Sequence, residues 1–231
     1  MPAAGGTPVR LRTDHDYDFD PSWSPDGHNI VFVSEKEARQ GPRELWISGT
    51  TPGSAAERLI RYPDRNLNGC EWSPDGGQIA FVAYSFPPWL SDILLVSTEG
   101  EEPTLWSEGG SSDRNPDWSP DGEKIAFSSD RSGNWDVWVR PAGGGEAVQL
   151  TDEPGWDGQP TWSPDGTQIA FTSDRGGSIH VWIMSAAGED PQPVTSGPYG
   201  DGDPAWSPDG DRICFERWGG NRSDIWVVHL E

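Results

Sequence analysis

The stretch Trp118-Ser119-Pro120-Asp121-Gly122 decides the fold, because the same five residue types occur in the same order five times in the chain. The copies begin at Trp23, Trp72, Trp118, Trp162 and Trp206, which lie 49, 46, 44 and 44 residues apart. This period is typical of the four-stranded blades of a β-propeller. The sequence therefore predicts an all-β protein in which each repeat forms one small antiparallel sheet.

The third repeat shows how one blade is built. Residues 119–122 have the chemistry of a tight turn, because Pro presets the second turn position and Gly accepts a positive φ at the exit. Residues 124–128 and 136–140 are rich in β-compatible apolar side chains, and a polar turn separates them. A glycine-rich turn at 143–145 then leads into a fourth segment at 147–150. We therefore expect four antiparallel strands in each blade.

The two ends of the chain together supply the remainder of one repeat. The run Pro2–Asp14 resembles Pro141–Asp152, which is the turn and outer strand that end an internal repeat. We expect residues 1–14 to form the closing outer strand of the last blade, with Thr7 to Leu11 pairing with Ile225 to Leu230. The prediction is a single five-bladed propeller domain over residues 1–231, its ring closed by the N-terminal strand joining the C-terminal blade.

Composition restricts the classes of partner. The chain has 16 Lys and Arg against 38 Asp and Glu, a net charge of −22, which disfavours nucleic acid and anionic membranes and favours cations or basic partners. It contains no apolar run long enough to span a membrane and no visible signal peptide. We expect a monomer that does not insert into membranes, cytoplasmic as written and periplasmic or secreted if a leader has been removed. Cys70 and Cys214 lie in repeats that are not neighbours, so we expect no disulfide.

The repeat resembles that of a known family. The pattern W-S-P-D-G-x-x-I-A-F, followed by S-D-R and then D-x-W-V, is similar to the WD-like repeat of TolB-like β-propellers over essentially the whole chain. Similar repeats occur in the periplasmic TolB propeller and in gating propellers attached to peptidases. The resemblance implies a propeller, but TolB itself has six blades and a separate N-terminal domain, whereas five blades and no preceding domain are expected here.

Ligands of propellers bind where the segments entering the innermost strands converge on the axis. Oxygen-bearing side chains recur there at two offsets from the anchor Trp. Five residues before it stand Asp18, Asp113, Asp157 and Asp201, and three residues before it stand Asp20, Asn115, Gln159 and Asp203. The second repeat departs from this pattern and offers Asn68 instead. We predict that these residues form an acidic, ligand-binding channel mouth.

Carboxylates that converge on one axis repel one another unless something offsets their charge. The compensating positive charge is either a Lys or Arg side chain from a partner or a hard cation such as Ca²⁺. The ligands of such a cation would be Asp18, Asp113, Asp157 and Asp201. The structural alternative is that each Asp caps its own loop or pairs with Arg131, Arg175 or Arg217 of the following loop. No contiguous calcium-binding loop favours the metal.

The second repeat also contains an unusual loop, Tyr84-Ser-Phe-Pro-Pro-Trp89. Phe86 and Trp89 are predicted to form an aromatic rim beside the acidic mouth, where they would anchor a peptide or stack on a sugar. The alternative is that Pro87 and Pro88 stiffen a loop whose aromatic side chains fold onto the blade.

Catalytic motifs are absent from the sequence. There is no Gly-x-Ser-x-Gly elbow and no phosphate-binding loop, and the four histidines are scattered. We therefore expect no catalytic residues and no cofactor, and predict a non-catalytic interaction module whose acidic mouth binds a basic peptide, a basic protein segment or a cation. Two alternatives remain: a sugar-active enzyme or lectin that uses the same mouth, whose binding would survive high salt, and a truncated or engineered repeat scaffold without a ligand.

Overall fold

Nineteen β-strands in five antiparallel sheets make up the described part of the computed structural model, which covers residues 10–11, 17–35, 42–62, 65–85, 90–219 and 222–230. The first blade contains β1 (Tyr17–Trp23), β2 (Asn29–Glu35), β3 (Arg43–Gly49) and β4 (Ala56–Arg61). The second contains β5 (Asn66–Trp72), β6 (Gln78–Tyr84), β7 (Ser91–Ser97) and β8 (Thr104–Leu105). The third contains β9 (Asp113–Trp118), β10 (Lys124–Ser129), β11 (Asp136–Pro141) and β12 (Val148–Gln149). The fourth contains β13 (Asp157–Trp162), β14 (Gln168–Ser173), β15 (His180–Ser185) and β16 (Gln192–Pro193), and the fifth β17 (Gly200–Trp206), β18 (Arg212–Gly219) and β19 (Arg222–His229).

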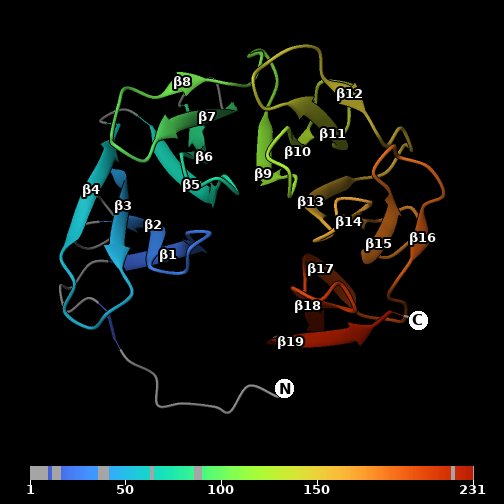
Figure 1. Ribbon diagram of the computed structural model, residues 1–231. Helices are drawn as coiled ribbons and strands as arrows, with labels where there is room; N and C mark the ends of the chain where they lie inside the picture. Colours follow the sequence, from blue (N-terminus) through green and yellow to red (C-terminus); the bar gives the residue numbers. More distant parts are fainter. Residues whose placement is uncertain are drawn as a thin grey trace.

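The five sheets are arranged around a central axis as the blades of a propeller, with β1, β5, β9, β13 and β17 innermost (Figure 1). This confirms the predicted all-β, five-bladed fold. Four blades have four strands, and the fifth has three within the described residues. Most of the segment 1–14, expected to supply its outer strand, lies outside the described residues. Arg10 and Leu11 are described but belong to no strand.

The core consists of four apolar clusters, each shared by two consecutive blades. Between the third and fourth blades, Val137 and Val139 of one sheet pack against Ile169 and Phe171 of the next, and the anchor Trp162 covers the inner end. The other three clusters are built in the same way: one blade contributes small or branched side chains, and the next blade contributes an Ile and a Phe. Because every blade is covered on both faces, its central strands are apolar on both sides. No such cluster joins the fifth blade to the first among the described residues.

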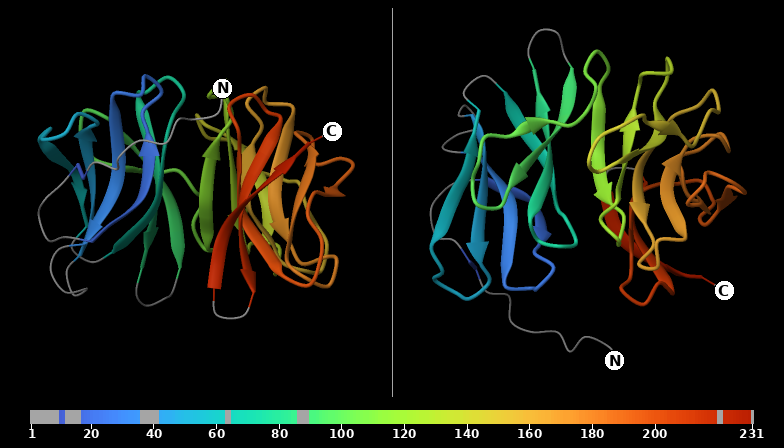
Figure 2. Two further views of the ribbon diagram at one scale, coloured as in Figure 1. Left: turned by 90° about the horizontal axis from the view of Figure 1, so that it is seen from below. Right: turned by 45° about the horizontal axis from the view of Figure 1, so that its top comes forward.

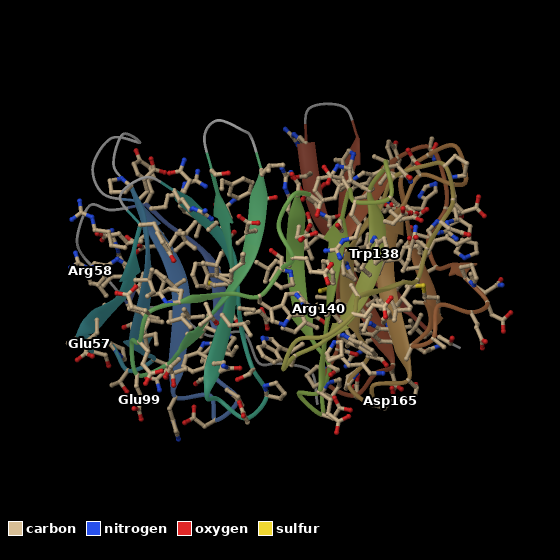
Figure 3. The ribbon with its side chains drawn as sticks, turned by 90° about the horizontal axis from the view of Figure 1, so that it is seen from above. Glu57, Arg58, Glu99, Trp138, Arg140 and Asp165 are labelled. Carbon is tan, nitrogen blue, oxygen red and sulfur yellow. The ribbon has the colours of Figure 1, made fainter. Side chains whose placement is uncertain are left out.

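The Trp-Ser-Pro-Asp-Gly stretches form the turns between the first and second strands of each blade. In the fourth repeat, Ser163 Oγ donates a hydrogen bond to Asp165 Oδ1 over 2.7 Å and accepts one from the N–H of Gln168 over 2.9 Å. Gly166 has a φ of +71°, which lies in the left-handed region that favours Gly. Figure 3 shows Asp165 at one rim of the propeller. The Ser–Asp hydrogen bond occurs in all five repeats, which explains why the motif is repeated.

Replacing Asp165 by Ala is expected to lower the free energy of unfolding by about 1 kcal/mol, because the acceptor for Ser163, for the N–H of Thr167 and for the Thr167 hydroxyl is lost. Urea denaturation followed by tryptophan fluorescence measures the change. Asp165→Asn is the matched control, since it retains the Oδ1 acceptor. Equal destabilisation by Asn and Ala would show that the hydrogen bonds of the turn do not carry the effect.

Candidate functional site

Each innermost strand contains a β-bulge at the residue three positions before its anchor Trp. These residues all have left-handed backbone conformations: Asp20, Gly69, Asn115, Gln159 and Asp203, with φ between 49° and 53°. The strand pairing shifts register at the same places. A β-bulge changes the direction in which the neighbouring side chains point. The predicted oxygen-bearing residues at this offset therefore form one structurally equivalent set, completed by Gly in the second repeat.

The bulge residues are linked laterally to neighbouring blades. Asp20 Oδ2 accepts a hydrogen bond from the N–H of Gly69 over 2.8 Å. The side-chain oxygen of Gln159 accepts one from the N–H of Asp203 over 3.2 Å, and its amide nitrogen donates to the Asp203 carboxylate. Asn68, predicted for the same site, accepts a hydrogen bond from Arg43. The ring of bulges thus also connects the blades around the axis.

A central cavity of about 460 Å³ follows the inner strands of blades two to five. Among the residues that line it are Asn115, Gln159 and Asp203 from the predicted mouth. Asp20 reaches its edge through the hydrogen bond to Gly69. Among the residues that the structure describes, no Lys or Arg lines this cavity. Burial raises the pKa of Asp203, and the nearby charges of Glu216 and Asp20 raise it further. The structure therefore brings together the residues at the offset of three around an acidic cavity.

The predicted mouth residues that stand five positions before the anchor Trp do not line the central cavity. Asp113, Asp157 and Asp201 are completely buried and pair with arginines of their own blades. The shortest distances between carboxylate oxygen and guanidinium nitrogen are 3.2 Å to Arg131, 2.7 Å to Arg175 and 2.5 Å to Arg217. This is the arrangement given above as the structural alternative to ligand binding. Asp18, the fourth member, is exposed and lines a separate pocket of the first blade beside Phe19.

These arginines also explain the recurring Trp of the third strand. The guanidinium of Arg175 lies 5.1 Å from the ring centre of Phe171 and 5.2 Å from that of Trp182. Arg131 and Arg217 stack on the corresponding Phe and Trp of their blades. Arg131, Arg175 and Arg217 therefore each lie between two aromatic rings and against a buried aspartate. Although burial alone would raise the pKa of Asp201, hydrogen bonds from Arg217, Thr195 and His180 hold it below its ordinary value.

Two cavity carboxyl groups were not predicted. Glu71 and Asp117 immediately precede their anchor Trp, where other repeats have Ser, Thr or Ala, and both line the central cavity. Burial raises the pKa of Glu71 to about 8, and the charge of Asp117 adds to this effect. Burial raises the pKa of Asp117 to about 7, although the N–H of Trp162 donates to its carboxylate over 2.6 Å. The sequence signal that could have identified Glu71 and Asp117 is that they differ from the residues at the same position in the other repeats.

Other sequence predictions have mixed outcomes. Phe86 and Trp89, the predicted aromatic rim, lie outside the described residues. Within the described part of the chain, no group of three or more His, Cys, Asp or Glu side chains is arranged to hold a metal ion. Cys70 and Cys214 are free thiols. Among residues that the structure describes, none forms a helix of the length and apolarity that crossing a bilayer requires.

The fold and the site define a β-propeller with an acidic central cavity. A family model described as the TolB beta propeller domain matches residues 52–231, and the chain belongs to this family. The resemblance expected from the repeat pattern is thereby confirmed.

Individual relatives agree with this assignment. The Tol-Pal system protein TolB of Anaeromyxobacter dehalogenans is 33% identical over 114 residues, which are 49% of this chain and 24% of that protein. The chain therefore spans about a quarter of the length of this relative. The structure of a putative TolB from Agrobacterium tumefaciens has a TM-score of 0.81 at 24% identity, over 95% of this chain and 79% of that chain. An oligogalacturonate lyase from Vibrio parahaemolyticus has a TM-score of 0.69 at 16% identity, over 95% and 65% respectively. These structural likenesses concern the fold.

Replacing Arg175 by Met is expected to lower the free energy of unfolding by about 3–5 kcal/mol, because it leaves the carboxylate of Asp157 buried without its cation. Met retains much of the apolar stem that contacts the aromatic rings. The double variant Asp157→Asn/Arg175→Met is expected to be more stable than Arg175→Met alone, as measured by urea denaturation. A double variant as unstable as the single one would contradict the role of the unpaired charge.

Stability is also expected to depend on Glu71. Its pKa in the folded protein is raised above the ordinary value of 4.5, so folding retains a proton that the unfolded chain releases. Stability contributed by this group should therefore fall as the pH rises from about 4.5 to 8 and level off above that. Glu71→Gln is expected to flatten this dependence and to raise the free energy of unfolding at about pH 8 by ~2 kcal/mol. Exposed Glu102 provides the control substitution Glu102→Gln, which should leave the pH profile unchanged.

Proposed function

We propose that the chain is a non-catalytic binding module whose central cavity receives a Lys- or Arg-containing segment of a protein partner. The observation that carries this proposal is the composition of the cavity: Glu71, Asp117 and Asp203 line it, and no Lys or Arg is among the described residues of its lining. A cationic side chain that enters the cavity would meet carboxyl groups that no described Lys or Arg of the lining neutralises. Asp113, Asp157 and Asp201 are buried and pair with arginines of their own blades, so they are not part of the proposed site.

The raised pKa values of Glu71 and Asp117 fit this role. In the free protein, protonation of these groups relieves the repulsion between carboxylates in the cavity. A bound guanidinium or ammonium group would favour their ionised forms and lower both pKa values, because an opposite charge at short range stabilises a carboxylate. Binding is therefore coupled to proton release and is stronger at pH 8 than at pH 6.

The cavity is poorly suited to acid–base or nucleophilic catalysis. Cys70 contributes to its lining, but burial raises the pKa of this thiol well above its ordinary value, which opposes formation of the reactive thiolate. His180 lies away from the cavity lining and is held 3.2 Å from Asp201. These observations support a binding function over an enzymatic one.

Relatives provide further support for a protein partner. The Anaeromyxobacter relative is named as a component of the Tol-Pal system, and a role within an assembly of proteins agrees with a binding module. We propose the same general role for this propeller, acting as a monomer. Ca²⁺ is an alternative occupant of the cavity, and the experiment below separates the two.

Binding of fluorescein-labelled octa-arginine, measured by fluorescence anisotropy, tests the proposal. Asp20→Asn/Asp203→Asn is expected to weaken binding about tenfold at ~150 mM NaCl, because two carboxylates at the cavity lose their charge. The matched variant Glu101→Gln/Glu102→Gln removes the same charge from an exposed turn and should change the dissociation constant less than about twofold.

Equal weakening by both double variants would show that the peptide responds only to net charge, and would contradict a site in the cavity. Thermal unfolding with and without Ca²⁺ is the second measurement. A midpoint raised by Ca²⁺ in the parent protein but not in Asp20→Asn/Asp203→Asn would assign the cavity to a metal ion instead of a basic segment.

A further inference from the structure

Arg114 differs from the other arginines that stack on aromatic rings in the described part of the chain. Its guanidinium carbon lies 5.2 Å from the ring centre of Tyr84 and 4.9 Å from that of Trp135. The other stacked arginines also lie within 4.0 Å of a carboxylate oxygen: Arg43, Arg131, Arg140, Arg175 and Arg217. No described carboxylate pairs with Arg114. In a chain with a net charge of −22, an arginine without an acidic partner needs an explanation.

This arginine lies where the second and third blades meet. The strand that carries it, β9, lies beside β6 and β7 of the second blade (Figure 1). Figure 2 shows the two blades, in green and in yellow-green, as neighbours around the axis. Tyr84 ends β6 and Ser91 begins β7, whereas Trp135 directly precedes β11 of the third blade. Side chains from both blades therefore hold one guanidinium group.

The contacts of Arg114 do not use its two terminal nitrogens. Its Nε donates a hydrogen bond over 3.0 Å to Oγ of Ser91, which is completely buried. The face of an aromatic ring attracts the cation but offers no lone pair to an N–H group in the guanidinium plane. No hydrogen-bond partner for Nη1 or Nη2 is found among the described residues, and Arg114 is only half-buried. These two nitrogens therefore form a positioned pair of donors for an external acceptor.

Two departures from the repeat pattern come together in this cluster. Arg114 stands four residues before its anchor Trp, where the fourth and fifth repeats have Gly158 and Gly202. Tyr84 stands where the third and fourth repeats have the Asp of the S-D-R motif. The other blades fold without these side chains, so the shared architecture does not require them. Departures of this kind are expected where a repeat has acquired a specific role.

We propose that Nη1 and Nη2 of Arg114 bind a carboxylate of a protein partner. The planar guanidinium group matches the two oxygens of a carboxylate, and both hydrogen bonds are strengthened by charge. Arg, Tyr and Trp are also the residues that most often dominate the binding energy of protein interfaces. The rings of Tyr84 and Trp135, together with the hydroxyl of Ser91, order the arginine before a partner arrives, which lowers the entropic cost of binding.

The charge of the chain restricts the kind of partner. A net charge of −22 repels polyanions such as nucleic acids and anionic membranes. Salt screens this repulsion beyond about 8 Å, so a single carboxylate in contact with Arg114 is governed mainly by that arginine. The occupant is therefore an isolated Asp, Glu or C-terminal carboxylate of a protein segment. Asn115, the next residue, lines the central cavity, so one partner can reach both sites, but the carboxylate site does not depend on the function proposed for the cavity.

Titration of the full chain with short peptides at constant ionic strength tests the proposal. The indole N–H signal of Trp135, assigned from the spectrum of Trp135→Phe, is followed by NMR. One probe, acetyl-Gly-Ser-Glu-Ser-Gly-amide, carries a side-chain carboxylate, and the other, acetyl-Gly-Ser-Gln-Ser-Gly, carries a C-terminal one. The Gln peptide with an amidated C-terminus is the uncharged control. At least one carboxylate peptide is expected to shift the signal saturably, with half-saturation on the order of 10 mM, and identifies the preferred source of the carboxylate.

Arg114→Lys retains the positive charge but loses the planar pair of donors, so it is expected to weaken binding at least about fivefold. An unchanged thermal unfolding midpoint shows that this variant remains folded. Arg222→Gln removes a charge from an exposed position of the fifth blade and should change the half-saturation concentration less than about twofold.

The absence of a saturable shift in the parent protein with both carboxylate peptides would overturn the proposal. So would a shift that persists in Arg114→Lys or that the uncharged peptide reproduces. Octa-arginine binding is measured separately. Loss of the positive charge of Arg114 does not weaken attraction of a basic peptide, so failure of the cavity site and failure of the carboxylate site are distinguished.

Discussion

The packing of one apolar sheet face against the next is the interaction on which the rest of the structure depends. A single blade of three or four short strands cannot cover its own Ile and Phe side chains, so each blade is stable only between neighbours. This requirement sets the order of strands and brings five inner strands to a common axis. The turns, the buried ion pairs and the central cavity all follow from that arrangement. The cavity exists because tapered sheets meet at their inner strands without filling the axis completely.

Periodicity was sufficient to predict the blades and their turns, because packing and turn chemistry repeat with the sequence. Periodicity was insufficient to predict the site. It shows that a residue type recurs at a given position of every blade, but it does not show whether that position faces the central axis. Asp157 and Gln159 are two residues apart, but a bulge lies between the pairing of Gly158 and that of Thr161. One side chain turns to Arg175 and the other to the cavity. A strand pattern alone does not show where such a bulge falls.

The proposed binding function rests more on residues that depart from the repeat pattern than on residues that repeat. Glu71 and Asp117 replace small or hydroxyl-bearing residues and place two carboxyl groups in a confined space, where burial changes their proton affinity. Asp113, Asp157 and Asp201, by contrast, pair with arginines of their own blades. Burial and partner geometry distinguish these two groups, and neither can be read from composition or spacing.

The absence of a shared core between the first and fifth blades within the described residues has a consequence for cooperativity. Blades that interact only with their neighbours behave as a nearest-neighbour chain. In a linear chain of this kind, each end blade has one interface to lose, whereas an internal blade has two, so disorder begins at the ends and spreads inward. A continuous circle has no ends, and every blade must then give up two interfaces at once. The state of that one junction therefore decides whether the propeller melts gradually or as a single unit.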